Sequence, residues 1–324
     1  WQFYVKVLGY REPAESWNPA NRNGNKYKIN MSTWHSGYWA GNEVPGSTAQ
    51  GRLNITPDGL RVDPPTWVVP HELMHVFQFH QRDGGQTVHG SWSEGHANYG
   101  RELWLNFYRD LFPNNERSGI DANYIHSAHM IVAHGRDYYL SWPFFMYLDE
   151  NPDGLPDLGF GTVANIWKNN LPGVYPYNTL ESMTPVSTLK DIIGYFARRQ
   201  LTFDYQNQAA ITNALNGQDP LVWRRFHLTE LVRRSDDTNW WRVPMEMAPM
   251  QGAYTLHELV PHGAGDGRVV AVNFRGLPDA ARGADWRASL IALSDSGEER
   301  YTPLWNSGSN SITLTPDQLA QIEE

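Results

Sequence analysis

The chain has 324 residues, of which 40% are hydrophobic and 19% charged, with a net charge of −9. This composition predicts a globular protein, and the length suffices for one large domain and a smaller one. No apolar run is long enough for a transmembrane helix, and no block of Lys and Arg favours nucleic acid or an anionic membrane as the principal partner. The absence of cysteine excludes disulfides and thiolate ligands, so a metal must be held by His, Asp or Glu.

The aromatic content is high, with 14 Trp and 16 Tyr. We expect most of these rings to pack in the core or between domains. Flat exposed aromatics also suit sugar rings and protein anchors, which keeps carbohydrate among the candidate ligands.

The first residue is Trp1 rather than Met. We expect a removed signal or lipoprotein segment, or an upstream domain, before it. Bacterial export and a cytosolic location both agree with a chain that has no cysteine.

The N-terminal stretch alternates in the manner of β-strands. The segments that show this pattern are WQFYVKVLGY, KYKINMSTW, RLNIT and GLRV, the last two around the turn Pro57-Asp58-Gly59. They predict a small antiparallel sheet. From Thr66 the apolar period becomes that of a helix, and Pro70 is tolerated there only near the helix start.

The middle of the chain is predicted to be mainly helical. After the helix that contains HELMH, further helices are expected in SWSEGHANYGRELWLNFYRDLF and over residues 121–133, 138–149, 158–170, 188–200 and 205–215. Beyond Asn239-Trp240-Trp241 the pattern changes to strands in AYTLHELV, GRVVAVNFRGL, WRASLIALSD, ERYTPLW and SITLT, which predicts a small β-sandwich. The expected fold class is therefore α+β, with domains at residues 1–237 and 238–324.

HELMH, residues 71–75, combines two histidines with a glutamate early on a predicted helix. Positions i and i+4 share a helix face, so His71 and His75 can direct their imidazoles to one point beside Glu72. This geometry suits zinc, but catalytic zinc takes three protein ligands and a water, so a third ligand must follow downstream. The alternative is a solvated helix face without metal.

Glu94 stands nineteen residues after His75, in the first turns of the second predicted helix. The combination resembles the gluzincin metallopeptidases, in which HExxH is followed by a glutamate on the next helix. The resemblance implies one zinc ion held by His71, His75 and Glu94, with Glu72 as general base. Thermolysin-type gluzincins carry an aspartate after the third ligand that bonds a ligand histidine; here Asn98 follows, and its carbonyl oxygen can accept that N–H less strongly.

A wider resemblance rests on YKIN before a Gly-rich segment, HELMHVFQ, the helix with Glu94, and YYLSWPFFMYLDENP. These segments look like a little-characterised family of secreted bacterial gluzincin-like proteins, related to avirulence proteins and ending in a β-sandwich. The resemblance implies a gluzincin-like catalytic domain and a secreted, periplasmic or cell-surface location. It leaves the substrate and the oligomeric state open.

Gluzincins also place a Tyr, His or Arg further along the chain to stabilise the oxyanion. Candidates cluster in NYIHSAHMIVAHGRDYY, where we favour His134 and Tyr138, with contacts between helices as the alternative for each. His80, His89 and His96 form either a rim around the motif or plain surface. Gln78, at the end of HELMHVFQ, orients a substrate or braces the second helix.

The expected function is a zinc metallohydrolase, with a metallopeptidase acting on protein or glycoprotein as the leading form. A glycan-active zinc enzyme on the same site, acting on polysaccharide, is the alternative suggested by the aromatic content. A binding module that retains zinc without turnover is a third reading, but a structural site does not need Glu72.

Calcium is a weaker expectation than zinc. DENPDGLPD, Asp149 to Asp157, matches the first half of an EF-hand loop, but the twelfth position is Phe160 rather than Glu. The end of a helix followed by a Pro/Gly turn explains the segment more simply.

Overall fold

The computed structural model describes residues 1–12, 29–33, 40–43, 51–61, 68–81, 91–108, 128–130, 139, 141–206, 208, 227–259, 268–277, 279–294 and 298–314. Within these ranges helices combine with short strands, which confirms the predicted α+β class. The chain forms two compact units, Trp1–Ile120 with Ala133–Pro185 and Asp121–Val132 with Val186–Glu324. These units divide after Pro185, and the predicted domain boundary at residue 237 stays a prediction.

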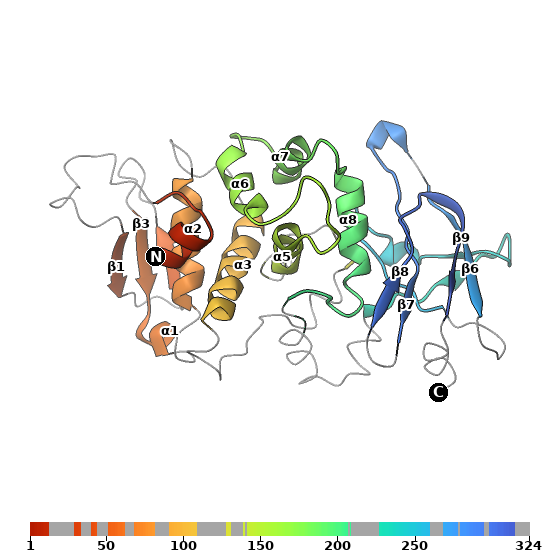
Figure 1. The fold of residues 1–324 in the computed structure, drawn as a ribbon, viewed down its shortest axis with the longest axis horizontal. Helices are drawn as coiled ribbons and strands as arrows, with labels where there is room; N and C mark the ends of the chain where they lie inside the picture. The colour runs from red at the N-terminus through yellow and green to blue at the C-terminus, as the bar shows by residue number, and fades with distance from the viewer. Residues whose placement is uncertain are drawn as a thin grey trace. The chain divides into compact units, whose positions relative to one another are not determined.

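A three-stranded sheet lies on one side of helix α2 in the first unit (Figure 1). Its strands are β1 (Ile29–Thr33), β2 (Ala40–Glu43) and β3 (Gly51–Ile55), in the order β1-β3-β2. β2 pairs antiparallel with β3, but β1 pairs parallel with β3. The prediction of an antiparallel sheet is therefore wrong for one pair, because β3 runs between β1 and β2 and the chain reverses twice from β1 to β3.

Two segments predicted as strands are helical. The first is η1 (Phe3–Val7), a π-type turn in which the Leu8 N–H donates to the Phe3 carbonyl at 3.1 Å. Phe3 and Tyr4 are both buried, although the alternation of a half-exposed strand would bury only one of two neighbours.

The second is α1 (Pro57–Arg61), which replaces the predicted strand GLRV. The Thr56 hydroxyl accepts the Gly59 N–H at 3.0 Å, so Thr56 acts as a helix cap, and Pro57 occupies the first helical position. Turn-forming residues here start a helix rather than a hairpin.

Helices α2 (Val68–His80) and α3 (Ser91–Phe107) form the centre of the first unit. On its sheet side α2 packs Val76 against Leu53 and Ile55 of β3. Another part of the α2 surface packs Met74 and Phe77 into a core cluster whose further buried members are Phe3, Tyr4, Leu8, Tyr10, Ala97 and Ala164. Both predicted long helices are confirmed, and this packing fixes them against each other.

The first unit also contains α5 (Trp142–Glu150), α6 (Thr162–Asn169) and α7 (Pro176–Met183). α5 is buried from Trp142 to Leu148, as expected of a central helix that is apolar on every side. The predicted helices at 138–149 and 158–170 correspond to α5 and α6, whereas α7 lies in a Pro/Tyr stretch that the apolar period did not indicate. The predicted helices at 121–133 and 205–215 fall largely outside the described residues.

The second unit combines α8 (Leu189–Arg198) with antiparallel strand pairs. The pairs are β4 (Val232–Arg233) with β5 (Trp241–Arg242), β6 (Val269–Arg275) with β9 (Ser307–Thr313), and β7 (Ile291–Leu293) with β8 (Glu299–Tyr301). Short 3-10 turns occur at η7 (Met245–Met247) and η8 (Ala280–Arg282). In the described part of AYTLHELV, residues 253–259, the one β-type pairing is an isolated bridge from Leu256 to Leu228, and a β-sandwich stays a prediction.

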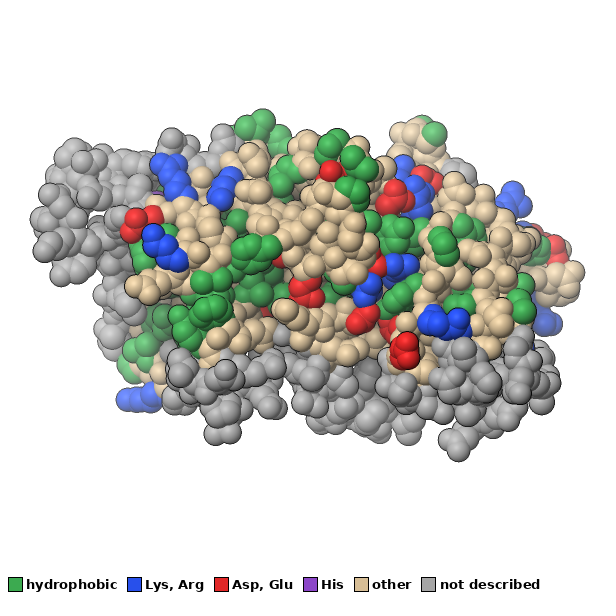
Figure 2. Space-filling model, viewed as in Figure 1, with side chains coloured by type: hydrophobic (Ala, Val, Ile, Leu, Met, Phe, Trp, Pro, Cys, Tyr) green, Lys and Arg blue, Asp and Glu red, His purple; other side chains and the backbone are tan. Residues whose placement is uncertain are grey.

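Basic and acidic side chains are interspersed on the described part of the face seen in Figure 2. None of the helices in the described ranges is both long enough and apolar enough to cross a membrane.

Candidate metal centre

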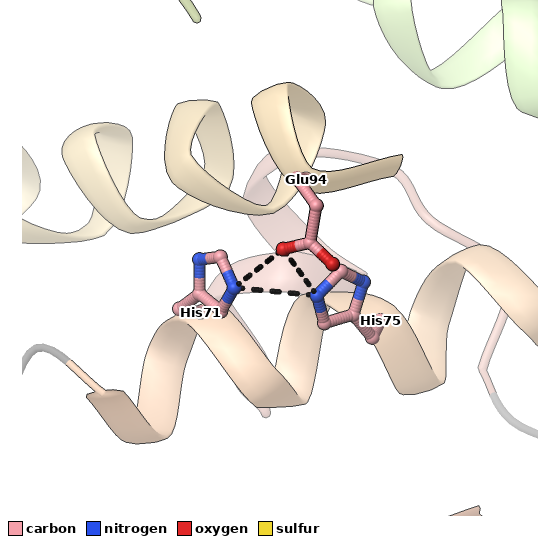
Figure 3. A group of neighbouring side chains, drawn as sticks. All are labelled: His71, His75 and Glu94. Carbon is pink, nitrogen blue, oxygen red and sulfur yellow. Dashed lines mark hydrogen bonds and ion pairs between the residues drawn. The ribbon is translucent and has the colours of Figure 1, made fainter. Parts of the chain in front are cut away.

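His71 and His75 of α2 and Glu94 of α3 point toward one another across the two helices (Figure 3). The Nε2 atoms of the two histidines lie 3.2 and 3.3 Å from the same Glu94 oxygen, and 3.3 Å from each other. Within the described residues this is the one cluster of three His, Asp or Glu side chains that could hold a metal ion. The three residues predicted as ligands are thus brought together.

The spacing of the three atoms fits four-coordinate zinc. Zinc binds nitrogen and oxygen at about 2.0 to 2.1 Å, so neighbouring corners of its tetrahedron are roughly 3.3 Å apart. The observed separations of 3.2 to 3.3 Å match that edge. The donor set, two imidazoles and a carboxylate, is also one that catalytic zinc sites use with a water in the fourth position.

The Nδ1 atom of His71 is engaged by Asn98, 2.7 Å away at the amide oxygen. The Asn98 amide nitrogen donates to the Tyr139 carbonyl at 2.5 Å, so the oxygen is the atom that faces His71 and Nδ1 is the donor. The prediction that Asn98 accepts this N–H is confirmed. As a consequence, the neutral His71 ring has no proton on its Nε2 atom, the atom that faces the centre of the cluster and that a metal ion would bind.

Gln78 contacts the Nδ1 atom of His75, as Asn98 contacts that of His71. Its Oε1 lies 3.0 Å from His75 Nδ1 and accepts the Ser93 hydroxyl at 2.6 Å, while its Nε2 donates to the Ser93 carbonyl at 2.7 Å. Gln78 therefore braces α2 against the start of α3, one of its two predicted roles. Its bond to His75 was not predicted, although a spacing of three residues on one helix face is a signal for it.

His96 continues this network behind Gln78. Its Nδ1 lies 2.8 Å from Gln78 Nε2, its Nε2 lies 2.5 Å from the Tyr10 hydroxyl, and its ring stacks on Trp167 with centroids 3.7 Å apart. Burial, with the charge of His75, lowers the pKa of His96 well below its ordinary value, so the ring is neutral. His96 is fully buried in the core and His80 is also buried, so both alternatives, a rim around the motif and plain surface, are wrong for these two, and His89 lies outside the described residues.

The charges of the cluster depend on one another. Burial opposes ionisation of Glu94, but His71 and His75, when protonated, donate to its carboxylate and attract its charge, which holds its pKa well below the ordinary value. Burial lowers the pKa of His71. Burial also lowers that of His75, but the hydrogen bond to Glu94 and the charges of Glu94 and Glu72 outweigh it and raise the pKa. Without a metal, His75 is thus the ligand histidine that more readily carries a proton, and a bound cation would displace that proton.

Glu72 follows His71 on α2 and is 8% exposed. No hydrogen bond or ion pair joins its carboxylate to another side chain among the described residues. Its charge acts on both His71 and His75, so the carboxylate lies near the cluster without being bonded to it. His134 and Tyr138, the predicted oxyanion donors, lie outside the described residues; their neighbour Tyr139 is 46% exposed, with its ring centroid 6.1 Å from that of His71.

The segment with partial EF-hand similarity forms the turn after α5. Asp149 accepts the Val163 N–H at 2.8 Å at the start of α6, and Asp153 accepts the Tyr147 hydroxyl at 3.1 Å. Asn151, in the left-handed region at φ 47°, bonds the backbone of Leu155. These oxygens serve the helix end and the turn rather than converging on one point.

The fold and the site define an α+β protein with a candidate three-ligand metal centre. The family model of DUF6055, a family of unknown function, matches residues 1–321, so the chain belongs to this family. No curated protein matches the chain. The resemblance to gluzincins stays a prediction, and the geometry of the site carries the functional argument.

Proposed function

We propose that the chain is a zinc-dependent metallohydrolase, and more narrowly a metallopeptidase that acts on protein or glycoprotein substrates. The observation that carries the proposal is the convergence of His71 Nε2, His75 Nε2 and one Glu94 oxygen at 3.2 to 3.3 Å. Glu72, adjacent in sequence and not committed to another described side chain, supplies the additional carboxylate that hydrolysis needs.

In the proposed mechanism His71, His75 and Glu94 hold the metal ion. When bound there, zinc lowers the pKa of water to about 7 and polarises a substrate carbonyl. Glu72 accepts the proton of the attacking water at its carboxylate and transfers it to the leaving amine. Behind the ligands, Asn98 and Gln78 keep the two imidazoles in the tautomer with an unprotonated Nε2.

Two observations favour a peptide bond over a glycosidic bond. Glycoside hydrolysis usually depends on a pair of carboxylates flanking the bond, but Glu94 is bonded to both histidines, which leaves Glu72 alone. In addition, some of the aromatic side chains that suggested a carbohydrate ligand lie in the core instead, since Trp92, Trp142 and Trp167 are buried. The glycan-active alternative is thereby weakened.

A secreted, periplasmic or cell-surface bacterial location belongs to the same proposal. It rests on the resemblance to secreted gluzincin-like proteins and on no feature of the described residues.

The test is hydrolysis by the zinc-loaded chain of bare proteins, glycosylated proteins and free glycans. Mass spectrometry should show new peptide termini that depend on Glu72, while the sugars stay intact. The Glu72→Gln variant is compared with Glu181→Gln, a matched change at an exposed glutamate of α7. Oligosaccharide release that Glu72→Gln abolishes would replace the proposal with a glycan-active enzyme. Bound zinc without hydrolysis of any substrate would favour the binding module.

A further inference from the structure

Asn98 uses both ends of its side-chain amide, although it is only 4% exposed. Its oxygen accepts the Nδ1–H of His71 at 2.7 Å, and its nitrogen donates to the Tyr139 carbonyl at 2.5 Å. A carboxylate at this position would make the first bond as well or better, but it has no hydrogen for the second. The amide is thus the group that can serve the metal ligand and the Tyr139 backbone together.

Tyr139 is placed beside the ligand by this bond. The ring centroids of Tyr139 and His71 lie 6.1 Å apart with an angle of 33° between the planes. His71 is 6% exposed whereas Tyr139 is 46% exposed, so the tyrosine presents an accessible aromatic surface next to a buried ligand. An aromatic ring at such a place can bury apolar surface of a bound molecule with little loss of conformational entropy.

We propose that Asn98 is a positioning residue that ties Tyr139 to His71, and that the Tyr139 ring determines specificity by contacting an apolar or aromatic side chain next to the cleaved peptide bond. The second part rests on the proposed function. The first part concerns a hydrogen bond of the folded chain and holds with or without turnover.

Asn98→Asp keeps one of the two hydrogen bonds of Asn98 and removes the other, so it tests them separately. The carboxylate keeps the bond to His71, so zinc affinity should stay within about threefold of the wild type or increase, because a carboxylate raises the basicity of the ring. The same carboxylate repels the Tyr139 carbonyl, so backbone amides in peptides that cover Tyr139 should exchange hydrogen about tenfold faster, as expected for one lost hydrogen bond. Asn98→Ala should show the faster exchange and also a loss of zinc affinity of roughly 10- to 100-fold.

Cobalt substitution supplies a spectroscopic control. The visible spectrum of the cobalt-loaded chain should be nearly unchanged in Asn98→Asp, because the ligand set is the same, and altered in His71→Ala. Unchanged exchange at Tyr139 in Asn98→Asp, or a zinc affinity as low as that of Asn98→Ala, would overturn the positioning role.

Tyr139→Ala and Tyr139→Phe test the ring itself and change a half-exposed side chain, so both should fold. Peptide libraries digested by the two zinc-loaded variants report the residues around each cleaved bond. Tyr139→Ala should raise KM about tenfold or more for peptides with apolar residues there and leave kcat within about threefold, while Tyr139→Phe should resemble the wild type. Equal cleavage preferences in Tyr139→Ala and the wild type would overturn the specificity role.

These outcomes separate the inference from the proposed function. A wild type that binds no zinc contradicts the metallohydrolase, yet the exchange comparison of Asn98→Asp with the wild type still decides whether Asn98 holds Tyr139. A wild type that binds zinc but hydrolyses no peptide refutes the specificity role along with the proposed function.

Discussion

Gly100 of α3 lies so close to Met74 of α2 that a Cβ atom on Gly100 would stand 2.1 Å from the Met74 Cε atom. The Tyr4 hydroxyl lies in the same contact, 3.0 Å from the Pro70 carbonyl of α2 and 3.4 Å from that of Gly100. The two helices that carry the candidate metal ligands thus approach at a position where only glycine fits without rearrangement.

Gly100→Ala should therefore lower the free energy of unfolding, because the usual cost of overpacking a buried contact, about 1 to 3 kcal/mol, exceeds the gain of up to about 1 kcal/mol from the better helix propensity of alanine. Denaturant unfolding of the metal-free chain measures the change. In a double-mutant cycle with Met74→Ala, the loss in the double variant should be smaller than the sum of the single losses, because the shorter side chain leaves room for the added methyl. Additive losses would contradict the close contact.

Gln78→Leu should weaken zinc binding by roughly 10- to 100-fold, the typical effect of removing a residue that orients a ligand. Leucine keeps the approximate volume but cannot accept the His75 Nδ1–H. Gln78→Glu, which retains an acceptor but not the donor to the Ser93 carbonyl, should fall between the wild type and Gln78→Leu. Competition with a chromophoric chelator measures the affinities, and equal affinities for wild type and Gln78→Leu would refute the role of Gln78.

Asp149 should make stability fall as the pH rises from about 4 to about 6. Burial raises its pKa from 3.8 to about 6, despite opposing hydrogen bonds from Tyr99 and the backbone of Val163, Gly161 and Thr162. Since the folded pKa exceeds the unfolded one, the stabilisation is complete below the unfolded pKa and lost as the pH rises through the folded pKa. The loss amounts to roughly 3 kcal/mol.

Urea unfolding across this range, for the wild type and Asp149→Asn, measures that effect. Asparagine does not ionise, so the wild type should lose stability relative to the variant as the pH rises. Parallel profiles for the two chains would show that Asp149 does not titrate in this way.

Glu72→Gln should bind zinc as the wild type does but lose turnover. The amide is nearly isosteric with the carboxylate but cannot accept the proton of the attacking water. Zinc content, the melting temperature and peptide hydrolysis are measured on the same preparation. Full hydrolysis in this variant would remove Glu72 from the mechanism.

The sequence predicted the metal cluster better than the sheet around it. The i, i+4 spacing of His71 and His75 and the position of Glu94 on the next helix are local patterns, and each translates directly into geometry. The direction of β1 relative to β3 depends instead on strand order, which alternation does not encode. Phe3 and Tyr4 do not follow the strand prediction because tertiary packing buries both neighbours, which the period of a strand does not anticipate.

The residues behind the ligands were only partly predictable. Asn98 could be proposed because the resemblance to gluzincins implies a residue after Glu94 that bonds a ligand histidine, whereas the bond from Gln78 to His96 and the stack of His96 on Trp167 join different helices. No local pattern predicts such contacts, since the bond arises only when α2 packs against α3 and the stack only when Trp167 of α6 reaches His96 of α3.

The most direct test of the metal centre is the zinc content of the purified full-length chain, by elemental analysis after dialysis against zinc and then against metal-free buffer. His75→Ala and Glu94→Ala are measured beside the wild type, with His80→Ala as a matched control on the same helix. We expect one tightly held zinc per chain in the wild type and in His80→Ala. His75→Ala and Glu94→Ala should retain no zinc after dialysis, because loss of a ligand should lower zinc affinity by more than the roughly 10- to 100-fold expected for residues behind a ligand. A wild type without zinc, or ligand variants that retain it in full, would contradict the assignment of His71, His75 and Glu94.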